Sequence, residues 1–289
     1  MIPGPFTYHR PASIEEAVGL LVSLGEESRP LAGGQSLIPM MKLRMATPEH
    51  LVDLGGVAGL KGIDVEPGGI RIGAAVTQAQ VIGSALIADR LPILRDAALQ
   101  IADPQVRTRG TIGGNVANGD PGNDMPAVMQ CLGASYVLAG PSGERSVAAR
   151  DFYLGPYFTL LEPGELLVAV RIPLPSAGHG QAYEKLKRKI GDYATAAAAV
   201  ILSATAGRIA TASIALTNVA PTPLLAEEAA RLVVGTSLDA ATLKAASAAA
   251  KAIADPAADG RGTAEYRREM AGVMVARALV KAFGRVKGA

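Results

Sequence analysis

One stretch of twenty residues, 107–126 (RTRGTIGGNVANGDPGNDMP), constrains this chain more than any other. It holds five glycines, three asparagines, two aspartates and two prolines, and few side chains that could enter a hydrophobic core. These residue types are typical of turns and of exposed backbone. We therefore expect a surface segment in the middle of the chain, with backbone hydrogen-bonding groups available to a ligand.

The overall composition indicates a folded protein with more than one core. The chain has 289 residues, of which 49% are hydrophobic, with a mean hydropathy of +0.26 and a formal net charge of +2. One core usually stops growing below this length, and the small charge argues against an electrostatic nucleic-acid binder. No signal peptide and no apolar run of about 18 residues is visible. We expect a soluble cytoplasmic protein with no membrane span and no nucleic-acid partner.

The chain offers little for metal ligation or covalent catalysis. Its single cysteine, Cys131, excludes an intrachain disulfide and a cysteine-ligated cluster or zinc site held by this chain alone. The segment around Asp120 and Asp124 is typical of Asx turns. The histidines show no ligand spacing and are expected to stand apart: His9, His50 and His179. We predict no catalytic and no metal-ligating residue on this chain.

Helical and strand patterns follow one another without the regular alternation of a doubly wound sheet, which favours an α+β fold in two or three lobes. Ser13 and Glu16 form a capping-box pattern, as do Thr77 and Gln80. Helices are predicted at 13–25, after Thr77, and at 91–102, 124–134, 223–235, 238–254 and 264–283. Strands are predicted at 50–54, 60–65, 69–76, 164–175, 181–189, 196–205 and 208–220, with a hairpin at 135–147.

Two segments, AGGQS (32–36) and TIGGN (111–115), share one local design. Each places a Gly-Gly pair before a polar residue, Ser36 or Asn115 adding a side-chain donor nearby. Glycine pairs permit positive φ and leave room for successive N–H groups to converge on an anion. A single pair is more often a plain turn. Two matching pairs suggest one long ligand held by both, and a diphosphate fits best.

Three common motifs are absent. Neither segment has the G-x-G-x-x-G of a dinucleotide-binding strand–turn–helix, and no G-x-x-x-x-G-K-[ST] phosphate loop occurs. The sequence GGQSL differs from the G-x-S-x-G nucleophile elbow at its last position. The basic run KLKRK (185–189) has no interleaved aromatics for base stacking, which favours a solvated strand or a docking surface.

A family resemblance runs essentially from end to end. AGGQSLIP, RTRGTIGGNVANGDPGNDMP and AYEKLKRKIGDYATAAAAV together resemble the FAD-binding medium subunits of the molybdenum hydroxylases, the xanthine dehydrogenase group. IADPQVR, VAARDFY, IALTNVAPTPL and YRREMAGVMVARAL extend the similarity. Within this group the chain looks most like the medium subunits of aerobic carbon monoxide dehydrogenases.

The resemblance implies a fold and a cofactor. The fold would be α+β, a two-lobed FAD-binding domain of the vanillyl-alcohol oxidase / p-cresol methylhydroxylase type followed by a smaller C-terminal α+β domain. We place the FAD-binding domain at residues 1–177, with lobes of about 1–55 and 56–177, and the C-terminal domain at 178–289. FAD would lie between the lobes, its diphosphate held by the two glycine segments.

The resemblance also implies individual contacts with FAD. Residues 32–36 and 111–115 would contact the diphosphate and adjacent sugar groups, Asp124 the sugar or ribityl hydroxyls, and Lys185 the isoalloxazine ring. Ile101 and Leu167 would be apolar contacts, and Tyr193 an aromatic cover for the ring. The two glycine segments consist of Ala32, Gly33, Gly34, Gln35 and Ser36, and of Thr111, Ile112, Gly113, Gly114 and Asn115. Carbon monoxide dehydrogenase subunits carry His at the position of Gln35, and Gln does not titrate.

The function that follows is electron transfer within a complex. A large subunit would carry the molybdopterin cofactor, and a small subunit the iron–sulfur clusters. This chain would pass electrons through FAD to an external acceptor such as a quinone. The resemblance further suggests a dimer of heterotrimers, with peripheral membrane association of the complex open. Three alternatives remain: a hydroxylase for an N-heterocycle, aldehyde or thioester, a flavin-free phosphate-binding module, and a standalone flavin oxidoreductase.

Overall fold

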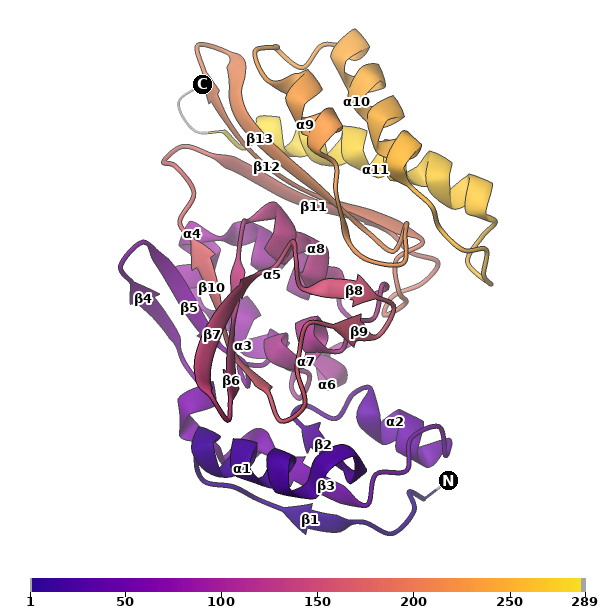
Figure 1. The fold of residues 1–289 in the computed structure, drawn as a ribbon. Coiled ribbons are helices and arrows are strands. Elements are labelled where there is room, and N and C mark those ends of the chain that lie inside the picture. Colours follow the sequence, from indigo (N-terminus) through magenta and orange to yellow (C-terminus); the bar gives the residue numbers. More distant parts are fainter. Residues whose placement is uncertain (1, 287–289) are drawn as a thin grey trace.

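The computed structural model describes residues 2–286 and shows three larger sheets following one another along the molecule, together with one short two-stranded sheet (Figure 1). A small sheet near the N-terminus lies at one end, a five-stranded sheet lies in the middle, and a four-stranded sheet backed by helices lies at the other end. Strands and helices are mixed without regular alternation, and the predicted α+β class is confirmed. Across residues 2–286 the helices are too short or too polar to span a bilayer.

The N-terminal sheet is parallel, with strand order β1-β3-β2 (Thr7–His9, His50–Asp53 and Ser28–Leu31). Helix α1 (Ile14–Leu24) packs beside it, begins at Ser13 as predicted, and ends before the 3-10 turn η1 (Gly25–Glu27). The Ser13 hydroxyl accepts from the Glu16 amide as predicted, whereas the Glu16 carboxylate accepts from the Ala12 amide in place of the Ser13 amide. Because the strands are parallel, the chain leaves β2 at the same edge where β3 ends.

The middle sheet is antiparallel, with strand order β4-β5-β10-β6-β7. The predicted hairpin is confirmed as β6 and β7, which join at Gly140 and Gly143. Strand β10 lies at the centre of the sheet, and its first five residues are buried, as expected for a strand covered on both faces. The strands are β4 (Ile63–Glu66), β5 (Gly69–Gly73), β6 (Ser135–Gly140), β7 (Gly143–Ala148) and β10 (Leu166–Pro173).

The helices that accompany this sheet lie between β5 and β6 in the sequence. Helix α2 (Leu37–Lys42) follows the first glycine segment and lies on the side of the N-terminal sheet (Figure 1). Thr77 begins α3 with the complete capping box that its sequence predicts. These helices are α3 (Gln78–Gly83), α4 (Ala85–Arg90), α5 (Pro92–Ala98), α6 (Pro104–Arg107), α7 (Ile112–Ala117) and α8 (Asp124–Cys131). The remaining short elements are η2 (Leu54–Gly56), η3 (Ala58–Leu60), β8 (Tyr153–Gly155) and β9 (Phe158–Thr159).

The C-terminal sheet is antiparallel, with strand order β11-β12-β13-β14. Three predictions need correction, the first being the strand predicted at 208–220, which ends at Thr217. The strand predicted at 181–189 ends at Leu186, and the helix predicted at 223–235 begins only at Glu227, because Leu224 and Leu225 pair with β13. The elements are β11 (Gly180–Leu186), β12 (Ala196–Thr205), β13 (Arg208–Thr217), β14 (Leu224–Leu225), α9 (Glu227–Val233), α10 (Ala240–Ile253) and α11 (Ala264–Phe283).

Strand β12 is rich in alanine because both of its faces are covered. Ala197 and Ala199 belong to the core of the middle sheet, whereas Ala196 and Ala198 belong to the core beneath the C-terminal helices. Successive side chains of a strand point to opposite faces. Small side chains therefore let α8 approach one face and α11 the other.

Arg267 of α11 should be a main determinant of the stability of the C-terminal region. Its guanidinium is 3% exposed and donates to the carbonyls of Thr195, Ala257 and Asn218. Substitution Arg267→Met leaves these carbonyls without their donor and should lower the free energy of unfolding by about 3 kcal/mol. The exposed Arg277 on the same helix is the matched control. Arg277→Met should change the free energy of unfolding by less than about 0.5 kcal/mol. Urea denaturation of both variants measures the difference, and equal midpoints would contradict it.

Candidate functional site

The two glycine segments touch each other. The first connects β2 to α2, and the second follows α6 and leads into α7. A Cβ atom added to Gly33 would lie 2.2 Å from the carbonyl oxygen of Arg109, so any larger residue would push the segments apart. Gly34 has φ +72°, a backbone conformation that residues other than glycine rarely adopt. The resemblance predicted that these segments lie close together, and the position of Gly33 against Arg109 and Gly110, just before the second segment, is consistent with that prediction.

The first glycine segment presents free backbone donors. The amides of Gly33, Gly34, Gln35 and Ser36 donate to no backbone carbonyl within residues 2–286. The side chains of Gln35 and Ser36 are exposed, and the Ser36 hydroxyl does not cap α2. Buried or half-buried amides need an acceptor from solvent or from a ligand. Successive unpaired N–H groups form the kind of concave backbone surface that binds phosphate oxygens.

The second glycine pair differs from the loop expected from the sequence, because it forms the first turn of α7. The Thr111 hydroxyl accepts from the Gly114 amide at 3.0 Å, and the Gly113 amide donates to Ala74 O at 2.9 Å. A Cβ on Gly113 would lie 2.5 Å from the Ala74 Cβ, so this glycine serves close packing. Gly114 is exposed. Its open face, rather than its amide, is what a ligand could approach.

Asn115 connects α7 to the start of α8. Its side-chain oxygen accepts from the Met125 amide at 3.2 Å, and its carbonyl accepts from the side chain of Asn123 at 2.7 Å. This places Asp124, the first residue of α8, directly beside the second glycine segment. The aspartate-rich turn that precedes α8 therefore fixes the distance between the glycine segments and the carboxylate.

Asp124 and Lys185 form an ion pair across the molecule, with Lys185 Nζ 2.9 Å from Asp124 Oδ2. The side chains are 5% and 1% exposed. Tyr183 donates its hydroxyl to Asp124 Oδ1, and Lys185 Nζ also donates to the carbonyl of Gln100 at 3.3 Å. Burial, followed by the charge of Asp124, raises the pKa of Tyr183 well above its usual value, so this hydroxyl stays protonated. The two charges predicted to face FAD separately are in contact with each other.

Two residues of this cluster were not predicted from the sequence, Tyr183 and Lys187. Tyr183 stands two residues before Lys185 on β11, a spacing that places both on one face of a strand and could have indicated it. Lys187 lies just beyond the strand. Burial lowers its pKa, and the positive charge of Lys185 lowers it further. Arg107 also lowers the pKa of Lys187. The positive charges of Arg107, Lys185 and Lys187 exceed the single negative charge of Asp124, which favours an anionic ligand.

The other predicted residues lie around this cluster. Ile101 follows Gln100 and packs against the core of the middle sheet. Leu167 is 4% exposed in β10, where it pairs with Leu138. Tyr193 is 42% exposed, with the guanidinium of Arg261 5.4 Å from its ring centroid. Leu167 is therefore a residue of the hydrophobic core, whereas the side chain of Tyr193 is accessible to a ligand.

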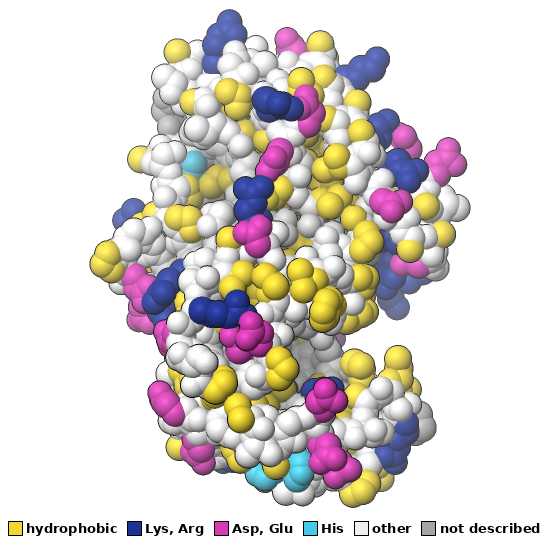
Figure 2. Space-filling view, in the orientation of Figure 1, with side chains coloured by type: hydrophobic (Ala, Val, Ile, Leu, Met, Phe, Trp, Pro, Cys, Tyr) yellow, Lys and Arg dark blue, Asp and Glu magenta, His cyan; other side chains and the backbone are white. Residues whose placement is uncertain are grey.

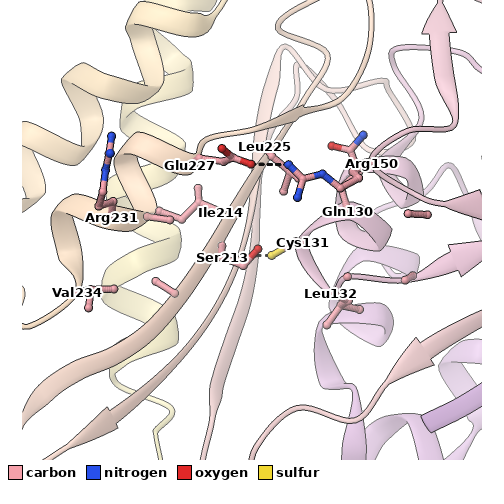
Figure 3. A pocket seen from close by; sticks show the side chains of 15 residues that line it. Gln130, Cys131, Leu132, Arg150, Ser213, Ile214, Leu225, Glu227, Arg231 and Val234 are labelled. Carbon is pink, nitrogen blue, oxygen red and sulfur yellow. Dashed lines mark hydrogen bonds and ion pairs between the residues drawn. The ribbon is translucent and has the colours of Figure 1, made fainter. Parts of the chain in front are cut away.

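Two cavities lie along the boundary with the C-terminal sheet. The first, about 630 Å³, lies between α8 and the β13–α9 region, and the ion pair between Arg150 and Glu227 spans it (Figure 3). None of its lining residues was predicted for FAD binding. Cys131 lies there, and burial raises the pKa of its thiol to about 12, so the thiol is inert at neutral pH. The second cavity, about 600 Å³, is lined by Tyr193, Tyr157 and Arg261.

Comparison with known proteins assigns both parts of the chain. The family described as "FAD binding domain in molybdopterin dehydrogenase" matches residues 4–175. The chain belongs to this family. The family described as "CO dehydrogenase flavoprotein C-terminal domain" matches residues 181–282. The predicted family membership is confirmed.

Similarity to individual members of the molybdopterin dehydrogenase family extends over the whole chain. It is 64% identical to the carbon monoxide dehydrogenase medium chain of Afipia carboxidovorans over 287 residues, covering 99% of this chain and 100% of that protein. Identity to the carbon monoxide dehydrogenase medium chain of Hydrogenophaga pseudoflava is 50% over 285 residues, covering 99% of each chain. The crystal structure of a Cu,Mo-CO dehydrogenase superposes with a TM-score of 0.98 at 64% identity, covering 99% of this chain and 100% of that chain.

Two glycine substitutions should separate folding from ligand binding. Gly33→Val forces a side chain into the Arg109 carbonyl and should lower both the FAD content and the free energy of unfolding, the latter by about 3 kcal/mol. In Gly114→Val the added Cβ would lie 2.9 Å from the movable Thr111 hydroxyl and 3.9 Å from the Ala32 Cβ, so FAD content should fall with a loss of stability of about 1 kcal/mol. Gly83→Val, with no neighbour within 4 Å, is the control. Flavin per chain and thermal denaturation measure both effects. Normal flavin content in Gly114→Val would remove that face from the site.

Breaking the ion pair should cost stability. Lys185→Met leaves a buried carboxylate without its cation and should lower the free energy of unfolding by about 3 kcal/mol. The double variant Lys185→Met, Asp124→Leu should recover part of this loss because no charge remains unpaired. The exposed Lys189 provides the control Lys189→Met. A double variant less stable than Lys185→Met alone would contradict this account.

Proposed function

We propose that this chain is the FAD-binding medium subunit of a molybdenum-dependent carbon monoxide dehydrogenase, which oxidises carbon monoxide to carbon dioxide. The observation that carries the proposal is 64% identity to the carbon monoxide dehydrogenase medium chain of Afipia carboxidovorans over 99% of this chain. A family match alone would leave the substrate open, because relatives at 33–36% identity are named for glyceraldehyde, nicotine and caffeine.

The described residues fit FAD. Four backbone amides after β2 have no backbone acceptor among the described residues, and Gly34 has a positive φ. The cations around Asp124 outnumber this one carboxylate. The amides of residues 33–36 would hold the diphosphate, together with the exposed face of Gly114. The unpaired oxygen lone pairs of Asp124 would accept from a sugar hydroxyl, and Tyr193 would cover the ring. The complete proposed set is Ala32, Gly33, Gly34, Gln35, Ser36, Ile101, Thr111, Ile112, Gly113, Gly114, Asn115, Asp124, Leu167, Lys185 and Tyr193.

FAD supplies a ring that takes up electrons and delivers them to an acceptor. The chain itself would bind, orient and tune this ring. Lys185 is held by Asp124 and Gln100, which leaves its charge fixed and partly neutralised. Lys187 has no carboxylate within salt-bridge distance among the described residues, so its charge is available to stabilise negative charge on a ligand. Gln35, which cannot titrate, would add hydrogen bonds whose strength does not change with pH.

The chain would work only as part of a complex. Its one thiol is buried and protonated, so iron–sulfur clusters must reside on a small partner subunit and the molybdopterin cofactor on a large one. We propose a dimer of such heterotrimers in the cytoplasm, with peripheral contact to the membrane surface where a quinone acceptor would be reached. The domain division at about residue 177 belongs to the same proposal.

The test uses the chain co-expressed with the large and small subunits encoded beside it. We expect one FAD per copy of this chain, iron and molybdenum in the co-purifying subunits, and bleaching of the flavin band near roughly 450 nm on addition of carbon monoxide. An assembly without flavin would contradict FAD binding. A flavin bleached by an aldehyde or an N-heterocycle but not by carbon monoxide would contradict the substrate alone.

A further inference from the structure

A group of potential metal ligands lies on the N-terminal sheet, away from the candidate FAD site. Glu27, Glu49 and His50 each offer a ligand atom, and these atoms all lie within 4.8 Å of one another. Figure 2 shows histidine and acidic side chains gathered at the lower edge of the molecule, where Figure 1 places β1 and β3. No spacing pattern predicts this group, because Glu27 lies far in the sequence from the adjacent residues Glu49 and His50.

The parallel sheet brings these residues together. Glu27 immediately precedes β2, and Glu49 immediately precedes β3. Ser28 is opposite His50 in the register, and the Glu49 amide donates to Glu27 O at 3.0 Å. Parallel strands begin at the same edge of a sheet. The backbone positions of all three ligands are therefore fixed by the ladder rather than by a mobile loop.

The two carboxylates of this edge lie close together in the structure. Glu27 and Glu49 form no ion pair with a lysine, arginine or histidine within residues 2–286, although Lys and Arg pair with carboxylates elsewhere on the surface. Two carboxylates held this close repel each other. A bound divalent ion would remove the repulsion and would use the imidazole of His50 as a third ligand.

His9 has the position of a supporting residue. Its Nε2 lies 3.1 Å from His50 Nδ1, and it is not among the three side chains whose ligand atoms converge. A metal-bound histidine almost always donates its second ring N–H to an acceptor, which fixes its tautomer. His9 can accept that hydrogen bond. The remaining nitrogen of the His50 ring would then be unprotonated and able to coordinate.

We propose that Glu27, Glu49 and His50 bind a divalent transition-metal ion of the zinc type, with His9 as the positioning residue for His50. Zinc binds imidazole nitrogens and carboxylate oxygens, and water would complete four-coordination here. Calcium and magnesium prefer oxygen ligands alone and in larger number. The exposure of both glutamates leaves the position open to solvent ions.

The role of this ion would be structural. The site lies where β2 and β3 begin, whereas the Ala32–Ser36 segment follows the opposite end of β2, roughly 13 Å along the strand at about 3.3 Å per residue. The ion would link two neighbouring strands at their start and stabilise the sheet that supports the glycine segment. It would not contact the proposed FAD site, so metal binding and flavin content should be independent.

The experiment uses the full-length chain without an affinity tag, stripped with a chelator and titrated with zinc chloride and with cobalt chloride. Zinc should raise the melting temperature by about 2–4 °C, and cobalt should give a visible absorption band at one equivalent. His50→Gln and Glu49→Gln should each abolish both responses. His9→Gln should weaken metal binding about 10-fold, as loss of a supporting hydrogen bond does. His179→Gln removes the third histidine and should leave both responses unchanged.

The controls decide between a site and unspecific binding. Far-UV circular dichroism and the metal-free melting temperature of each variant must match the parent chain, which shows that lost binding is not lost folding. A cobalt band that survives in His50→Gln, or one that disappears in His179→Gln, would overturn the proposal. An equal rise in melting temperature with magnesium chloride would do the same, because that response needs no imidazole.

Discussion

The buried ion pair between Asp124 and Lys185 is the interaction on which the arrangement of the candidate site depends. It joins the first residue of α8 to a strand of the C-terminal sheet, 61 positions further along the chain. Asn115 ties the same end of α8 to the second glycine segment. Gly33 then brings the first segment against the second. Parts of all three sheets are thus connected through one set of short contacts.

The two glycine segments look alike in sequence, yet they do different work. The amides of the first segment have no backbone acceptor among the described residues. In the second segment the Gly114 amide donates to the Thr111 hydroxyl, and the Gly113 amide donates to the carbonyl of Ala74. A diphosphate held between them would meet donors on one side and a smooth, side-chain-free surface on the other. The polar residues that follow the glycines also differ, since Asn115 bonds to the start of α8 whereas Gln35 and Ser36 are exposed.

Long elements with clear periodicity could be predicted from the sequence. Short strands, and contacts between residues far apart in the sequence, could not. The helix 264–283 and the strand 196–205 have the predicted bounds, because twenty and ten residues carry enough pattern. Strands β1 and β2 have three and four residues, too few for alternation to show. His9 and His50 stand 41 positions apart and meet only through strand pairing. The pairing of Asp124 with Lys185 was missed for the same reason, although both residues were predicted for the site.

The alanine face structure of β12 has a mechanical consequence. The strand is a single layer between α8, which carries Asp124, and α11, which closes the far side of the molecule. Close-packed interiors have low compressibility, and methyl groups leave no slack to absorb a shift. A displacement of α8 would therefore move β12 and α11 with it as one rigid body. The packing therefore links the position of α8 to that of α11 through one strand.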